Sequence, residues 1–150
     1  MPVEKRLNSS GFTLIELIIV IIVLGIVAAV AIPKMGDVSQ NSKTNATRTE
    51  MLTLKRAIIG NPQVIAGNRH ANPGFEGDVG HPPITLSELA IKPDSIATYD
   101  RFLHRGWNGP YVDSAGNDYL KDAWDVAYIY DGINRKITSA GGPDSIVVSF

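Results

Sequence analysis

The 150-residue sequence contains no cysteine and no surplus of positive charge. The absence of cysteine excludes disulfides, thiolate chemistry and cysteine-ligated zinc. The 14 basic residues are balanced by 15 acidic ones, so nothing in the composition favours neutralising the phosphates of a nucleic acid. We therefore expect no nucleic acid as the main partner.

Motifs of common enzymes are also missing. The histidines, His70, His81 and His104, are scattered and form no HExxH pair, and there is no GxSxG, Walker or GxGxxG loop. We therefore expect a protein without catalysis of its own. The alternative is an enzyme anchored in the membrane by its amino end and exposed to the periplasm. This alternative predicts that residues 34–150, when isolated, turn over a substrate.

One segment near the amino end is almost free of charge. Residues 12–32, FTLIELIIVIIVLGIVAAVAI, contain Glu16 as their only charged residue. As a helix this run is roughly 31 Å long, about the hydrocarbon thickness of a bilayer. Lys5 and Arg6 precede it, and basic residues favour a cytoplasmic location for the end that carries them. The pattern predicts a membrane helix with the rest of the chain outside the cytoplasm.

The residues leave three interpretations of this segment open. A simple anchor explains its length but not the carboxylate of Glu16. A cleaved secretory signal is favoured by the small-x-small sequence Ala29-Val30-Ala31, but its apolar part would be long and would contain that carboxylate. The third interpretation is a leader that is cut before the apolar run, so that the helix stays with the product.

The third interpretation comes from a resemblance. GFTLIELIIVIIVLGIVAAVAIP is similar to the signal of type IV pilins and type II secretion pseudopilins, which a prepilin peptidase cuts after glycine before the new N-terminal phenylalanine is methylated. The resemblance implies cleavage between Gly11 and Phe12, N-methylation of Phe12, and an assembly role for Glu16. In related filaments this carboxylate pairs with the amine of a neighbouring subunit. A carboxylate in an apolar helix costs roughly 2.5–3.5 kcal/mol on insertion scales and needs such a partner.

The rest of the chain predicts an α+β fold in which a long N-terminal helix packs against a small antiparallel sheet. Met51, Leu54 and Ile58 have helical spacing, so we expect one helix from residue 12 to 59 that ends at Gly60-Asn61-Pro62. The apolar face of this helix is expected to cover the sheet.

After the helix we expect loops and short elements. Residues 72–83 contain three prolines and three glycines and are expected to be largely loop. Residues 85–88, TLSE, read as a capping box before a short helix. Strands are predicted over 126–130, 135–139 and 146–148.

Two C-terminal motifs extend the resemblance to major-subunit pseudopilins of type II secretion. GWNGPYV resembles their GW-GPY element, and KDAWDVAYIY resembles DPWG-x-x-Y-x-Y, although Ala123 replaces proline and Asp125 replaces glycine. Major type IV pilins usually close this region with a disulfide, which a chain without cysteine cannot form.

A third motif, ITSAGGPD, resembles S-x-G-x-D with one extra residue. Related pseudopilins hold calcium near this position with carboxylates, a serine and backbone carbonyls, so the resemblance implies Ser139 and Asp144 as calcium ligands. Hard oxygen ligands suit calcium. The family's acidic tail is replaced here by SIVVSF, and the alternative is a turn in which Asp144 caps local amides.

The resemblance also implies an organisation and a function. Residues 1–11 are a leader, 12–33 a transmembrane and assembly helix, 34–60 its continuation and 61–150 a periplasmic α+β head. The chain is then a structural subunit of a type II secretion pseudopilus, a homo-oligomeric filament that is polymerised to drive protein export.

The expected partners are prepilin peptidase, an inner-membrane assembly platform with its ATPase, minor pseudopilins and the inner membrane itself. We expect a single-pass inner-membrane protein before assembly and a periplasmic filament afterwards. The alternative is a type IV pilin or minor pilin for adhesion, motility or DNA uptake.

Overall fold

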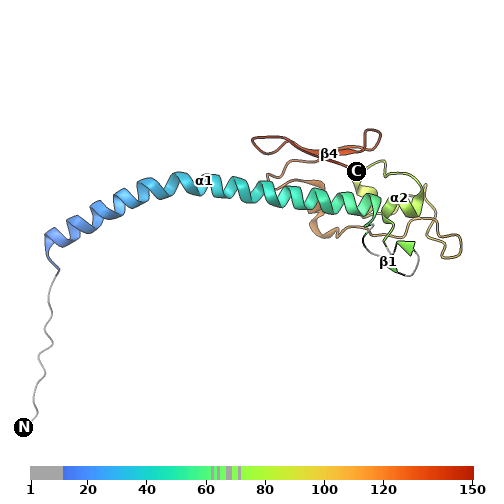
Figure 1. Cartoon of the computed structure of the whole chain (residues 1–150), viewed down its shortest axis with the longest axis horizontal. Helices are drawn as coiled ribbons and strands as arrows, with labels where there is room; N and C mark the ends of the chain where they lie inside the picture. The colour runs from blue at the N-terminus through green and yellow to red at the C-terminus, as the bar shows by residue number, and fades with distance from the viewer. Residues whose placement is uncertain (1–11, 62, 64, 67–68, 71) are drawn as a thin grey trace, which may run out of the picture. The chain divides into compact units, whose positions relative to one another are not determined.

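The computed structural model describes residues 12–61, 63, 65–66, 69–70 and 72–150, and it divides the chain into two compact units that meet between Ser39 and Gln40. Helix α1, Leu14–Ile59, contributes to both units (Figure 1). The predicted long helix and its end before Gly60 are therefore confirmed. The predicted leader, residues 1–11, lies outside the described residues.

The second unit contains a three-stranded antiparallel sheet with the order β3-β4-β5. Its strands are β3, Ile129–Asp131, β4, Lys136–Ser139, and β5, Ile146–Ser149. In the register, Tyr130 lies opposite Ile137, and Ile137 lies opposite Val148. Because side chains alternate along a strand, β5 directs Ile146 and Val148 inward and leaves Val147 exposed.

The first of these strands is shorter than predicted. Residues 126–128 do not pair with β4, because they fold back on the segment before them: Asp122 N donates to Val126 O and Tyr128 N donates to Leu120 O. Only residues from Ile129 onward are free to join the sheet. The two later strands are confirmed.

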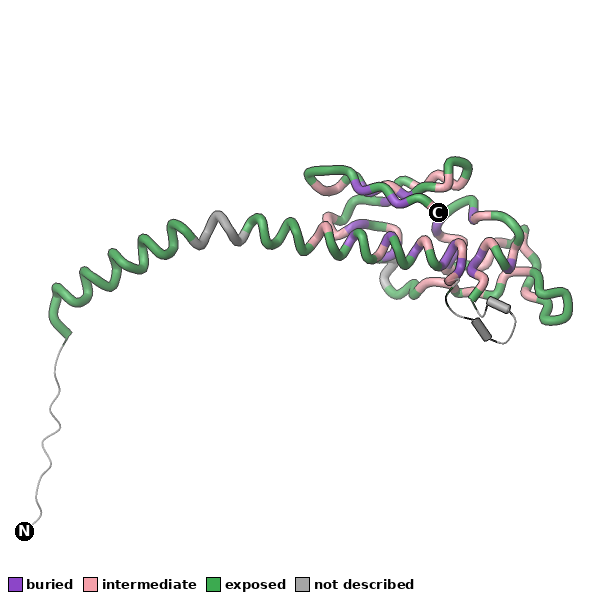
Figure 2. The backbone as a smooth tube through the Cα atoms, in the orientation of Figure 1, coloured by how far each residue is buried: buried purple, intermediate pink, exposed green. Residues whose placement is uncertain are grey.

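The core of the second unit lies between the C-terminal part of α1 and the sheet, where Figure 2 shows the buried residues in purple. The predicted helix face, Met51, Leu54 and Ile58, is buried in it, and Ile137 of the central strand is fully buried in the same cluster. This confirms the α+β prediction and the packing of the sheet on the helix. The remaining buried apolar residues of the cluster are Ala57, Phe75, Leu86, Leu89, Tyr119, Tyr128, Ile146 and Val148.

The prediction of loop over residues 72–83 was wrong, because this segment contains helix α2, Gly74–Val79. The prolines lie outside the helix, and Gly80 ends it in the left-handed conformation with φ of 99°. Phe75 gives the short helix a fully buried anchor. Gly60 and Gly74 both have positive φ, and a Cβ on Gly74 would lie 2.8 Å from the carbonyl oxygen of Ile58, so the junction between α1 and α2 requires glycine.

The capping-box prediction at residues 85–88 was also wrong. The segment forms a 3-10 helix, η1, Leu86–Leu89, and no side chain caps it. The Thr85 hydroxyl pairs with the Ser87 hydroxyl at 2.8 Å, while the Glu88 carboxylate accepts the Ile84 amide at 2.9 Å. Leu86 and Leu89 are three residues apart and both buried, which suits the three-residue turn of a 3-10 helix.

Three short elements complete the described part of the second unit. Strands β1, Ile65–Ala66, and β2, Arg69–His70, pair antiparallel with each other. The 3-10 helix η2, Ala115–Leu120, leads into the loop before the sheet.

Candidate functional site

The amino end of α1 is closed by a capping box that the sequence reasoning missed. The Thr13 amide and the Thr13 hydroxyl both donate to Glu16 Oε2, at 2.8 and 2.7 Å, and the Glu16 amide donates to the Thr13 hydroxyl at 3.3 Å. Reciprocal bonds of this kind satisfy helix amides that have no partner within the helix. The signal was present, because a threonine stands three residues before a glutamate at the start of an apolar run. Glu16 therefore has a partner within its own chain.

The apolar residues after this cap are exposed among the described residues of the first unit. Between Phe12 and Val30 the exposed fraction of the large hydrophobic side chains ranges from 45% at Val20 to 84% at Phe12. A helix that is apolar on all sides is ordinarily buried in lipid or protein. The structure therefore places Phe12 and Glu16 at the start of an uncovered apolar surface. The predicted cleavage site stays a prediction, because Gly11 lies outside the described residues.

The membrane span over 12–33 stays a prediction. Among the residues described, no helix combines the length and the apolar character needed to cross a bilayer. The side chains of residues 31–35, part of the predicted span, are not among those described.

A second cluster, in the second unit, is centred on the buried carboxylate of Asp122. Its Oδ2 accepts bonds from the Ser139 hydroxyl at 2.6 Å and the Gly141 amide at 3.0 Å. Its Oδ1 accepts the amides of Trp124 and Val126 at 2.9 and 3.0 Å. Burial alone would raise the pKa of Asp122, but the four donors outweigh it and lower the pKa, so the carboxylate is ionised. We call these residues the Asp122 cluster.

The Asp122 cluster explains the glycine of the ITSAGGPD motif. A Cβ on Gly141 would lie 2.5 Å from Asp122 Oδ2, so only glycine lets this backbone amide reach the carboxylate. Sequence reasoning named Ser139 but missed its partner, because Asp122 is 17 residues away and only the fold brings the two together.

Ser139 and Asp144, the predicted calcium ligands, have different surroundings in the structure. The Ser139 hydroxyl is buried and is used by Asp122, whereas Asp144 is exposed. Among the described residues, no group of three or more acidic, histidine or cysteine side chains could hold a metal ion. Calcium therefore stays a prediction. A melting temperature of the full chain that rises with millimolar calcium, and no longer does so in Asp144→Ala, would support it.

The KDAWDVAYIY motif attaches the Asp122 cluster to α1. Thr47, buried on the helix, accepts the Ala123 amide at 3.1 Å. The Trp124 indole donates to Gln40 Oε1 at 2.9 Å, and the Tyr128 hydroxyl donates to Glu50 at 2.9 Å. All of these contacts lie within the second unit, so the motif has a structural role there.

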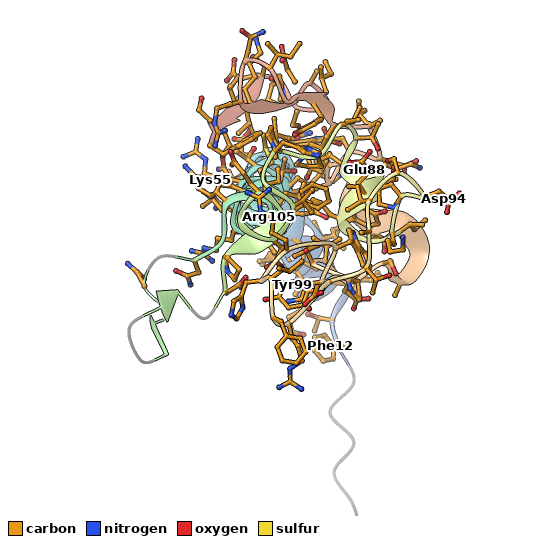
Figure 3. All side chains as sticks on the ribbon, turned by 90° about the vertical axis from the view of Figure 1, so that its right-hand side faces the viewer. Phe12, Lys55, Glu88, Asp94, Tyr99 and Arg105 are labelled. Carbon is orange, nitrogen blue, oxygen red and sulfur yellow. The ribbon has the colours of Figure 1, made fainter. Side chains whose placement is uncertain are left out.

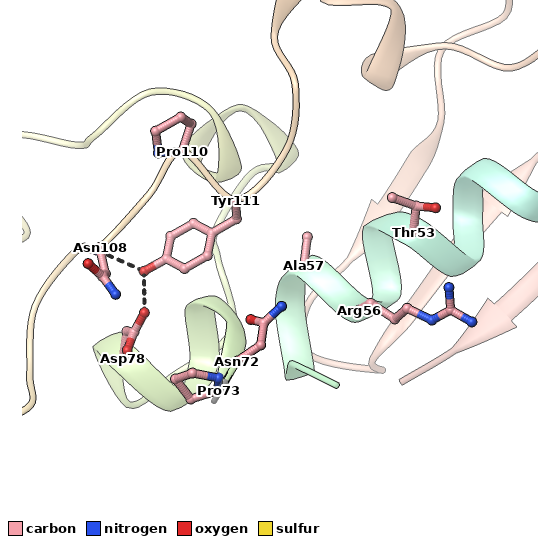
Figure 4. Close-up of a pocket in the computed structure, with 9 residues that line it drawn as sticks. All are labelled: Thr53, Arg56, Ala57, Asn72, Pro73, Asp78, Asn108, Pro110 and Tyr111. Atoms are coloured by element: carbon pink, nitrogen blue, oxygen red, sulfur yellow. Dashed lines mark hydrogen bonds between the residues drawn. The ribbon is translucent and has the colours of Figure 1, made fainter. Parts of the chain in front are cut away.

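The GWNGPYV motif has a similar role. The Trp107 indole donates to Glu88 O at 2.8 Å, and the Tyr111 ring packs on Phe75 with a centroid distance of 5.6 Å. As Figure 4 shows, the Tyr111 hydroxyl accepts the Asn108 amide and donates to Asp78 at 3.0 Å. Burial raises the pKa of both Asp78 and Tyr111. A cavity of about 330 Å³ borders Asp78 and Tyr111. The carboxylate and the hydroxyl of these two residues are already bonded to each other.

Comparison with known proteins gives a match at the amino end. Residues 6–32 match the family described as the prokaryotic N-terminal methylation motif. A fimbrial protein of Pseudomonas aeruginosa is 45% identical over 47 residues, 31% of this chain and 30% of that protein. A type IV major alpha-pilin of Moraxella bovis is 46% identical over 48 residues, 32% of this chain and 30% of its own.

A type II secretion system core protein G of Pseudomonas aeruginosa is 32% identical over 54 residues, 36% of this chain and 38% of that protein. The chain thus spans about a third of the length of the curated relatives it matches. No solved structure is significantly similar to it. These findings confirm the resemblance to the type IV pilin superfamily, pseudopilins included. The protein is pilin-like and carries a prepilin-type N-methylation motif.

Proposed function

We propose that this chain is a structural subunit of a type II secretion pseudopilus. The observation that carries the proposal is the apolar surface of α1 between Phe12 and Val30, which is exposed among the described residues and has the carboxylate of Glu16 near its start. Such a surface is stable only when lipid or other subunits cover it. The match to a type II secretion core protein G and the lack of cysteine favour a pseudopilus.

Processing comes first in the proposed sequence of events. Prepilin peptidase cuts between Gly11 and Phe12, and the new amino group of Phe12 is methylated. Thr13 and Glu16 both lie on the product side of the cut, so the capping box survives it. Before assembly the apolar helix holds the subunit in the inner membrane as a single-pass protein.

Assembly then exchanges lipid contacts for contacts between subunits. Both capping bonds that reach the Glu16 carboxylate end on Oε2, so Oε1 is left to accept from the methylated amine of a neighbouring subunit. This pairing offsets the burial of both charges and sets the axial register between subunits. An inner-membrane platform with its ATPase drives polymerisation, minor pseudopilins join the filament, and the subunit itself performs no catalysis.

A type IV pilin or minor pilin is the second candidate. It is favoured by the 45% and 46% identities to the fimbrial protein and the alpha-pilin, which exceed the identity to core protein G. Both candidates share the processing step and the apolar helix, so the amino end does not separate them.

A deletion strain separates the two candidates. For a pseudopilus, we expect loss of exported proteins from the medium with surface pili unchanged, and restoration by the wild-type gene but not by Glu16→Leu. Loss of surface pili with normal export would favour the pilin. Intact-mass measurement should show a chain that begins at methylated Phe12, and a chain beginning near residue 32 would contradict both candidates.

A further inference from the structure

Two exposed apolar features of the second unit are not explained by its own packing. The first is the turn at residues 100–105, which we call the finger. Phe102 and Leu103 stand at its tip with 87% and 74% of their surface exposed. Tips of surface turns are ordinarily polar or small, so two large apolar side chains at this position need another explanation.

The finger is held in shape by hydrogen bonds at its base. Asp100 and Arg105 exchange backbone bonds, with Asp100 N to Arg105 O at 2.8 Å. The Asp100 carboxylate accepts the amides of Phe102 and Leu103 at 2.7 and 3.1 Å. The next residue along, Gly106, donates to Asp78 O and so ties the finger to the core. These bonds restrain the backbone of the tip, which lowers the entropy cost of binding.

The second feature is an apolar groove of about 630 Å³ beside the turn that joins β3 and β4. Ile84, Ile129 and Ile133 line it and are 75%, 58% and 95% exposed. Tyr130 lines it as well, and its hydroxyl donates to Pro83 O at 2.8 Å. This bond joins the two chain segments that line the groove. The volume is within the range of sites that bind side chains or small ligands.

Arg101 beside the finger tip and Asp131 at the groove have opposite charges. Arg101 is exposed next to the finger tip, and the ion pairs among the described residues, Lys121–Asp125 and Glu76–Arg135, do not involve it. Asp131 lines the groove, and the carboxylate of Glu88 bonds the amide of Ile84 at its edge. Opposite charges at the rim of an apolar contact direct the approach of partners and fix their register.

The finger and the groove come from different segments of the second unit, because the groove is lined by residues 81–84 and 129–133. Figure 3 shows Tyr99, at the base of the finger, in the lower part of the view and the C-terminal strands at the top. The finger is held by the bonds at its base and none of its residues lines the groove, so a contact between the two would join two molecules. A contact between two different surfaces is head-to-tail, and when it does not close on itself it produces a filament.

We propose that the finger of one subunit inserts into the groove of a second copy of this chain, with Phe102 against Ile133 and Arg101 near Asp131. The inference rests on the proposed filament function and adds to it a contact between heads. Apolar side chains in the groove supply affinity, and the charge pair sets which neighbour is accepted.

Disulfide trapping tests the contact directly, because the full-length chain has no cysteine of its own. Filaments of the double variant Phe102→Cys with Ile133→Cys should, on mild oxidation, give a ladder of dimers, trimers and longer chains. A mixture of the two single variants should give dimers only, and either single variant alone should stay monomeric. Bridging requires Cα atoms within about 7 Å, so a ladder reports proximity and not mere collision.

A matched control pairs Phe102→Cys with Val147→Cys, since Val147 is exposed on β5 and does not line the groove. Wild-type-like filaments that give no ladder, or an equal ladder from the control pair, would overturn the contact and leave the proposed function standing. Failure of the wild-type chain to form filaments would instead contradict the proposed function.

A second measurement does not depend on cysteines. Phe102→Ser should lower filament yield about tenfold, as expected for a central apolar anchor, while the melting temperature of the full chain in detergent stays unchanged. Ile91→Ser, at another exposed isoleucine, should leave the yield unchanged. Arg101→Glu should lower the yield and Arg101→Lys should not. Normal filaments from both Phe102→Ser and Arg101→Glu would contradict the proposal.

Discussion

The two units of the chain use apolar residues in opposite ways. In the second unit, Met51 and Ile58 of α1 are fully buried against Ile137 and its neighbours. In the first unit, the same helix carries a longer apolar run that is exposed wherever its side chains are described. The hydrophobic effect stabilises the second unit from within, whereas the first gains that stabilisation only from other molecules.

The polar groups of the two units differ in the same way. Asp122 has four donors from its own unit and needs no outside partner. Glu16 keeps one oxygen unused by the bonds of its cap. The comparison indicates that changes in the second unit act on folding, while changes in the first act on assembly.

The largest effect is expected from Glu16→Leu. The variant removes the carboxylate that the proposed function pairs with a neighbour's amine, leaving that amine buried and unpaired. We expect a stable, cleaved chain whose incorporation into filaments falls by at least about tenfold, measured by filament yield and by intact mass. Thr13→Ala is the matched control, because it removes the hydroxyl that bonds Glu16 but keeps the carboxylate and the backbone amide that donates to it. Normal filaments from Glu16→Leu would contradict the role of Glu16.

A core substitution tests whether the second unit stabilises itself. Ile137→Ala should lower the free energy of unfolding by about 2–5 kcal/mol, since it opens a cavity at a fully buried position. Ile133→Ala, four residues away and almost fully exposed, should change that free energy by less than about 0.5 kcal/mol. Thermal or denaturant unfolding of the full chain in detergent measures both. Equal effects of the two variants would contradict the described core.

The Asp122 cluster predicts a dependence on pH. Because the pKa of Asp122 is lowered in the folded protein, the carboxylate adds stability above its unfolded pKa and loses it as the pH falls below about 4. Asp122→Ala should lower the free energy of unfolding by about 2–3 kcal/mol at neutral pH, because buried donors lose a charged acceptor. The same variant should flatten the acid part of the pH profile. If the acid part of the profile is the same in Asp122→Ala and the wild type, other carboxylates cause the loss of stability at low pH.

The smallest effect is expected at the cap of α1. Thr13→Ala should destabilise the first turn by about 1 kcal/mol, as expected for loss of a threonine N-cap. Hydrogen exchange of the first-turn amides in detergent should then become faster, while amides of the second unit stay unchanged. Thr13→Ser retains a hydroxyl and is expected to behave as the wild type. Equal exchange in Thr13→Ala and Thr13→Ser would show that the cap contributes nothing.

Several features could be predicted because their signals are local. The helix to Ile59 follows from apolar spacing, and the strands after the turn at residue 131 follow from alternation. Local composition wrongly predicts a loop over residues 72–83, where helix α2 is anchored in the core by one buried aromatic residue, Phe75. Alternation also predicts too long a strand at residues 126–130, where backbone bonds to an earlier segment compete with the sheet.

By itself the sequence determined the apolar helix, the isolated carboxylate of Glu16, the α+β composition and the resemblance to pilins, because each is carried by neighbouring residues. Only the tertiary structure decided that the Ser139 hydroxyl donates to Asp122 and that residues 81–84 and 129–133 together form a groove. Those relations join residues far apart in the chain. Burial and hydrogen bonding select among the many such pairings only once the core has formed.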